Sequence, residues 1–368
     1  MKRFGVPRNP PAPDPRAQTL QGTRRMLHPR VLALVGWLLM GAGLLPGCAT
    51  STTVPAAREA PAEELFPQGF LTIHPGQMDA EDRYLSAVMV VVDTPGQGGT
   101  PGSCSGVLAH PRMVITAGHC VCAGREPTRE DEASRASSKV MLLQRRQAGV
   151  MTRAAALQDI SLTKITDAGS PCSKSVQVRT VAYGSAKEAS SRERSERFSG
   201  RVVPHPHFEI ILGRRDGAPQ VVWSNADLAV IFLERPVPLE LPRLDLADSE
   251  VQVGDVITLV GFSHGTSSPP SYGVRYFGEN SVNRLIPLET GSVVFRVEAQ
   301  HLSDGRAASH AQRGDSGGAC IKKGTPNQLV GITTVGGTKP TGEPMSFFTS
   351  VYSHRQWLLE MLAQADES

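Results

Sequence analysis

Short apolar runs rich in valine and isoleucine recur from Tyr84 onward, and residues typical of turns separate them. The 36 glycines and 28 prolines supply the many turns that such a chain needs. An apolar fraction of 40 % supports a globular core. The pattern therefore predicts an all-β domain and favours it over a helical bundle. The runs are Ala87 to Val92, Met113 to Thr116, Val202 to Val203, Leu228 to Phe232, Val256 to Val260, Val293 to Val297 and Leu329 to Thr334.

The last segment of the chain has a different spacing. Val351, Trp357, Leu358 and Met361 recur at helical intervals, and the segment contains no glycine or proline. We therefore expect a closing amphipathic helix over residues 351–365.

The first 47 residues are typical of an export signal. Three arginines precede the uncharged apolar stretch from Val31 to Leu45, and small residues follow it. The end of the stretch, Leu44-Leu45-Pro46-Gly47-Cys48, resembles a bacterial lipobox. That resemblance implies cleavage before Cys48, a lipid on Cys48 and a tether over residues 48–83. An uncleaved membrane anchor and plain secretion are the alternatives.

This leader also explains the net charge of +3. The first 48 residues hold seven basic residues and one acidic residue, which leaves 31 basic and 34 acidic residues in the rest. The exported chain is thus mildly acidic, and we expect no nucleic-acid partner. Ala49 in the second position resembles the sorting signal for outer-membrane retention, so we expect a protein of the bacterial cell envelope. The run from Arg192 to Arg197 alternates in charge and predicts a solvated loop.

Three segments carry residues suited to acyl transfer, which needs a hydroxyl, a base and an anion that orients the base. His119 follows the apolar run that ends at Thr116, and Asp227 stands at the start of a strongly apolar run. The third segment, Arg313-Gly314-Asp315-Ser316-Gly317-Gly318, places glycines close to a serine. Such backbone bends tightly, so the amides of Gly314 and Ser316 are candidates for an oxyanion hole.

Together these segments resemble the trypsin/chymotrypsin-like serine protease family, over about Tyr84 to Leu362. Its motifs are T-A-A-H-C, a D-I/L-A-L strand and G-D-S-G-G, and Gly261-Phe262-Ser263 is similar to its G-W-G turn. The resemblance implies two six-stranded antiparallel β-barrels followed by a helix, within a protease domain at 84–365. The first barrel would span about 84–236 and the second about 244–350.

The resemblance also implies roles in a peptide-cleaving site that needs no metal or organic cofactor. Ser316 would be the nucleophile, His119 the general base and then acid, and Asp227 the orienting anion. Thr334, Val335 and Gly336 would pair with the backbone of a protein or peptide substrate.

The specificity pocket would have His310 at its floor, while Gly336 and Ser346 keep its walls open. A preference for lysine or arginine is disfavoured, because the aspartate it needs is absent. A histidine at the floor suits acidic side chains.

Two departures from the family stand out. Gly118 replaces the commoner alanine before the histidine, and we expect this change to be tolerated. The family also frees an Ile-Val-Gly-Gly terminus whose amine pairs with the aspartate before the nucleophile. The nearest candidate, Ile73-His74-Pro75-Gly76, has no basic residue before it. The chain must use another cleavage or satisfy Asp315 differently, and a protease-like binding or scaffold protein without productive catalysis is the rival hypothesis.

Six cysteines become five available thiols if Cys48 is lipidated. The family resemblance implies a Cys104–Cys120 bridge beside the histidine, and we expect Cys122 to pair with Cys172 and leave Cys320 free. Zinc is a competing interpretation of Cys120-Val121-Cys122, but the spacing is unusual and a second ligand pair is missing.

Overall fold

The computed structural model of the 368-residue chain describes residues 73–92, 102–131, 161–184, 194–215, 218–263, 273–325, 327–338 and 342–367. All of them belong to one compact unit, Ala62–Ser368. The expected leader, Cys48 and the tether up to residue 72 lie outside the described residues. Among the described helices, none has the length and apolar character needed to cross a bilayer.

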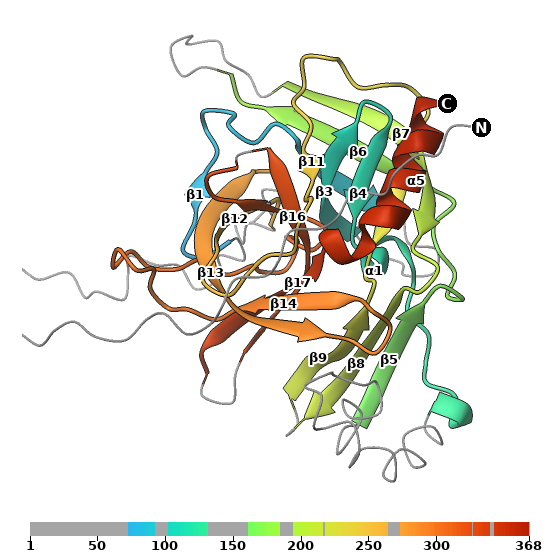
Figure 1. Ribbon diagram of the computed structural model, residues 1–368. Coiled ribbons are helices and arrows are strands. Elements are labelled where there is room, and N and C mark those ends of the chain that lie inside the picture. The colour runs from blue at the N-terminus through green and yellow to red at the C-terminus, as the bar shows by residue number, and fades with distance from the viewer. Residues whose placement is uncertain are drawn as a thin grey trace, which may run out of the picture. The chain divides into compact units, whose positions relative to one another are not determined.

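The first barrel confirms the expected all-β architecture. Its six antiparallel strands close in the order β10-β4-β3-β2-β6-β7 (Figure 1). The apolar runs expected at Ala87–Val92 and Met113–Thr116 coincide with β2 and β4. Both strands are almost wholly buried, as their apolar sequences require. The strands are β2 (Ala87–Val92), β3 (Gly102–His110), β4 (Met113–Thr116), β6 (Ser175–Ala182), β7 (Arg194–Pro204) and β10 (Ala229–Leu233).

The second barrel is built from the later strands of the chain. Six antiparallel strands run in the order β13-β12-β15-β16-β17-β14, and pairing of β13 with β14 closes the ring. The short β1 (Gln77–Met78) extends β13, and β11 (Asp245–Leu246) pairs with β16. The barrel strands are β12 (Val256–Gly261), β13 (Tyr276–Pro287), β14 (Val293–Val297), β15 (Ala319–Lys322), β16 (Gln328–Thr338) and β17 (Pro344–Ser350).

A third, three-stranded sheet lies outside both barrels in the order β5-β8-β9. Its strands are β5 (Ser161–Asp167), β8 (Glu209–Arg215) and β9 (Ala218–Asn225). Ile211 and Trp223 of this sheet share a buried cluster with Leu288 and Val294 of the second barrel. The sheet therefore fixes the end of β9, two residues before Asp227.

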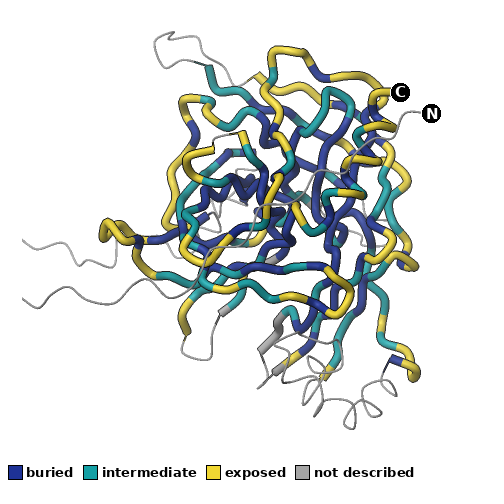
Figure 2. Tube along the Cα trace, viewed as in Figure 1, coloured by how far each residue is buried: buried dark blue, intermediate teal, exposed yellow. Residues whose placement is uncertain are grey.

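The chain closes with the expected helix. A short 3-10 helix, η3 (Tyr352–His354), leads into α5 (Arg355–Asp366). Leu358, Met361 and Ala365 bury one face of α5 in a core cluster that also holds residues of both barrels. In Figure 2 the buried residues gather along the barrel strands, whereas exposed residues mark the turns.

Residues 73–83, which the sequence assigns to the tether, are folded against the second barrel. Ile73 is buried in that barrel's core, and residues 77–78 pair with β13. Asp79 and Arg275 form an ion pair in which both side chains have no exposed surface. The folded unit thus begins at or before Ile73.

Candidate active site

His119 lies on the short helix α1 (Gly118–Val121), directly after β4. Its ring Nδ1 is 2.7 Å from Oδ2 of Asp227, and its backbone N–H donates to Oδ1 of the same carboxylate at 2.9 Å. Asp227 is fully buried between β9 and β10. The preceding Ala226 has a φ of 43°, a conformation that L-residues rarely adopt and that the packing must enforce. The structure thus holds His119 to Asp227 at two points, one on its backbone and one on its ring.

The charge of Asp227 sets the proton affinity of His119. Burial alone lowers the pKa of His119, but the negative charge of Asp227 and its hydrogen bond outweigh burial. The pKa therefore rises above its ordinary value of 6.5. A histidine with a raised pKa accepts a proton readily. Because Nδ1 faces Asp227, the nitrogen that can accept this proton is Nε2.

Gly118 has a packing reason for its place in the motif. A Cβ atom at this position would lie 2.7 Å from a ring carbon of the buried Phe208, closer than packed carbon atoms approach. Glycine therefore fits beside Phe208, whereas an alanine at this position would require the ring to shift.

Ser316 lies on a tightly bent loop after residue 313, where Gly314 and Gly317 have positive φ values of 101° and 81°. The amides of Asp315, Gly317 and Gly318 each donate a backbone hydrogen bond within the protein. In the described part of the chain, the amides of Gly314 and Ser316 have no such partner. These are the two amides that the sequence suggests for an oxyanion hole.

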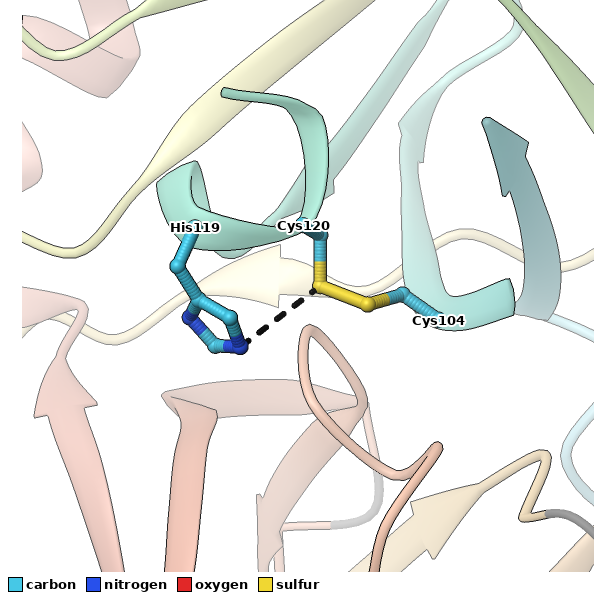
Figure 3. A group of neighbouring side chains, drawn as sticks. All are labelled: Cys104, His119 and Cys120. Atoms are coloured by element: carbon cyan, nitrogen blue, oxygen red, sulfur yellow. Dashed lines mark hydrogen bonds between the residues drawn. A yellow bond between two sulfur atoms is a disulfide. The ribbon is translucent and has the colours of Figure 1, made fainter. Parts of the chain in front are cut away.

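The Cys104–Cys120 disulfide lies beside both His119 and the serine loop. Nε2 of His119 lies 3.9 Å from Sγ of Cys120 (Figure 3), and the carbonyl oxygen of Ser316 lies 3.6 Å from the same sulfur. The Ser316 hydroxyl donates to the carbonyl oxygen of Thr334 at 3.2 Å. No hydrogen bond joins Ser316 Oγ to His119 among the described residues.

Two further serines brace this loop, and the sequence interpretation missed both. Ser105 donates to the carbonyl of Gly314 at 3.0 Å and accepts from the amide of Phe262 at 2.8 Å. Ser263 donates a short hydrogen bond to Oδ1 of Asp315. A usable signal existed for Ser263, since it replaces the last glycine of the family's G-W-G turn.

Asp315 is almost fully buried, which shifts its titration toward neutrality. Burial raises the pKa of Asp315 to about 7, although hydrogen bonds from Ser263 and from the amide of Gln312 lower it. The amide of Gln312 lies 2.8 Å from Oδ2. The carboxyl group is thus held by neutral donors.

A cavity of about 330 Å³ opens beside Ser316. Gly336 contributes to it from β16, and Val335 lies on the same strand. Ser346 is buried behind the wall, where its hydroxyl accepts from the amide of Ala311 at 2.9 Å. The lining consists of Ala311, Gln312, Arg313, Ser316, Gly336, Gly337 and Pro344.

His310 is not among the residues that line this cavity. Its Nε2 atom lies 3.1 Å from the carbonyl oxygen of Ala299, and its backbone pairs with that of His74. A role for His310 in specificity stays a prediction.

The trypsin family model matches this chain over residues 78–201 and 172–358, which together cover most of its length and all strands of both barrels. The chain belongs to the trypsin family. Its domain is therefore of the serine-protease type, with the two barrels that this fold requires.

The cysteines of this trypsin-family domain pair as the sequence suggests. The structure contains the Cys104–Cys120 and Cys122–Cys172 disulfides, and Cys320 is free and buried in β15. His119 is near enough to Cys104 and Cys120 to suggest a metal site. However, the two sulfurs are bonded to each other, so neither is the thiolate that zinc binds.

Proposed function

We propose that this protein is an exported serine endopeptidase that cleaves peptide bonds with His119, Asp227 and Ser316. The observation that carries the proposal is the two-point attachment of His119 to the buried Asp227, at 2.7 and 2.9 Å. This attachment places the proton on Nδ1 and leaves Nε2 as the base.

In the proposed reaction, Oγ of Ser316 attacks the substrate carbonyl carbon while His119 Nε2 accepts the hydroxyl proton. The carbonyl oxygen becomes an oxyanion, which the amides of Gly314 and Ser316 stabilise. His119 then gives the proton to the leaving amine, and the C–N bond breaks to leave an acyl-enzyme. A water molecule then attacks the carbonyl carbon of the acyl-enzyme while His119 accepts its proton. The C–O bond to Ser316 breaks, His119 returns the proton to Oγ of Ser316, and the carboxylic acid product leaves.

The Ser316–Thr334 hydrogen bond suggests how substrate starts this reaction. A substrate strand alongside β16 would present its own N–H to the Thr334 carbonyl. That donor would displace the Ser316 hydroxyl, which can then turn to His119. Hydrogen bonds of this kind often tighten only in the substrate complex.

Among the described residues that line the cavity beside Ser316, Arg313 is the one with a charge. A positive charge there favours substrates with acidic side chains near the cleaved bond. Profiling of cleavage sites with a peptide library tests this preference, and Arg313→Ala should weaken it. An unchanged profile would leave no role for Arg313 in selection.

A fluorophosphonate probe, which reacts with activated serines, tests the function itself. We expect the detergent-solubilised full-length chain to be labelled, and the Ser316→Ala variant to remain unlabelled. Persistent absence of labelling in the folded wild-type protein would overturn the enzyme proposal and favour a binding or scaffold protein.

We further propose that the protein is held at the bacterial outer membrane by a lipid on Cys48. The two disulfides support export, because they form in oxidising compartments. Wild-type protein should partition with membranes and Cys48→Ser should not. Equal partitioning of both would contradict the lipid anchor.

A further inference from the structure

The buried Asp315 next to the proposed nucleophile lacks the cationic partner that such a carboxylate usually requires. Its side chain has almost no exposed surface. The groups that act on it are the Ser263 hydroxyl and the Gln312 amide, and no charged side chain is among them in the described ranges.

Ser263 relays this interaction to the start of the folded unit. Its Oγ donates to Asp315 and accepts from the backbone N–H of Ile73 at 3.2 Å. A hydroxyl has one donor and two acceptor sites, so both bonds form at once. In the 368-residue chain the Ile73 nitrogen belongs to a peptide bond and carries no charge.

The segment that carries Ile73 is fastened independently of any chain terminus. His74 exchanges two backbone hydrogen bonds with His310, at 3.0 and 2.9 Å. Further along, Arg275 binds Asp79 at 2.7 Å and Asp82 at 2.8 Å, and no part of its side chain is exposed.

The same Arg275 reaches the turn that holds Ser263. Its guanidinium lies 5.8 Å from the centre of the Phe262 ring, next to Ser263 in sequence. The Phe262 amide bonds to Ser105, which in turn binds the Gly314 carbonyl. One connected network therefore joins the 73–84 segment, the 261–263 turn and the loop of Ser316.

We propose that Ser263 is a positioning residue for the serine loop, and that its hydroxyl replaces a free chain terminus as the partner of Asp315. The consequence is that this chain is competent without cleavage before Ile73. This inference rests on the proposed peptidase function, because competence is measured at Ser316.

The first experiment identifies the N-terminus of competent molecules. The full-length chain is labelled with the fluorophosphonate probe, and top-down mass spectrometry reads where each labelled molecule begins. We expect labelled chains that still carry residues before Ile73. If every labelled molecule begins at Ile73, the inference is wrong while the peptidase function stands. If no wild-type molecule is labelled, the peptidase function fails and the inference fails with it.

The second experiment tests Ser263 directly with a matched control. Ser263→Ala should slow labelling of the full-length chain between about tenfold and about a hundredfold, as expected for loss of a hydrogen bond to a charged group. Ser350→Ala removes a comparable buried hydroxyl, which donates to the partly buried Glu250, and should change labelling by less than about twofold.

Ser263→Thr, which keeps the hydroxyl, should recover part of the lost rate. Because the Ser263 hydrogen bond lowers the pKa of Asp315, its removal should also move the acid limb of the labelling profile to higher pH. Thermal melting first establishes that both variants are folded. Equal labelling rates and equal pH profiles for Ser263→Ala and Ser350→Ala would then overturn the positioning role of Ser263.

Discussion

Asp227→Asn isolates what the buried carboxylate does for His119. In the structure, Oδ1 accepts the backbone N–H of His119 and Oδ2 accepts its Nδ1–H. An asparagine that keeps the first bond turns its NH₂ group toward Nδ1. The ring must then accept at Nδ1 and carry its proton on Nε2, where it cannot take the proton of Ser316.

The expected loss in kcat is about 10⁴-fold, equivalent to about 5.5 kcal/mol of transition-state stabilisation. The assay is the fluorophosphonate labelling rate together with peptide hydrolysis at pH 7.5. Asp304→Asn, a charge change on the exposed surface, serves as the control. If the Asp227→Asn protein is folded and its labelling and hydrolysis rates stay within about tenfold of wild type, the orienting role of Asp227 is refuted.

Three further predictions concern titration, packing and covalent structure. The labelling rate should rise with pH through a pKa above 6.5, because His119 must be neutral and Asp227 raises its pKa; a midpoint below 6.5 would contradict this. Gly118→Ala should cost about 1 to 3 kcal/mol in urea unfolding, because the added methyl overlaps Phe208, and unchanged stability would show that the ring yields freely. Replacing Cys122 and Cys172 by alanine should cost about 4 kcal/mol, as loop-closure entropy predicts for a separation of 50 residues; a loss below about 1 kcal/mol would contradict that reasoning.

Strand positions were predictable where β-branched residues are buried on both faces of a strand. This holds for Ala87–Val92 and Val293–Val297, which coincide with β2 and β14. The three-stranded sheet, in which β8 and β9 form a hairpin and β5 joins β8 from a segment distant in sequence, was not predicted. Residues 194–197, expected in a solvated loop, form the exposed start of β7, where backbone pairing with β6 requires no apolar side chain.

In the candidate site, too, residues in local motifs could be predicted, whereas contacts between distant segments could not. His119, Asp227 and Ser316 could be proposed from local motifs, and the structure brings their segments to one place. Ser263 also carried a local signal, but its link between Ile73 and Asp315 could not be predicted, because Ile73 and Ser263 lie 190 residues apart in the sequence. The direction of the His310 ring likewise depends on a carbonyl, that of Ala299, which no local pattern specifies.

The central claim is that Ser316 forms an acyl-enzyme with His119 as its base. Rapid-quench measurements with an activated ester substrate, followed by tandem mass spectrometry of the trapped protein, test it most directly. We predict a burst of about one acyl group per chain, located on Ser316 and absent from His119→Ala. Turnover at the wild-type rate with no acyl group on Ser316, or in the Ser316→Ala variant, would contradict the account.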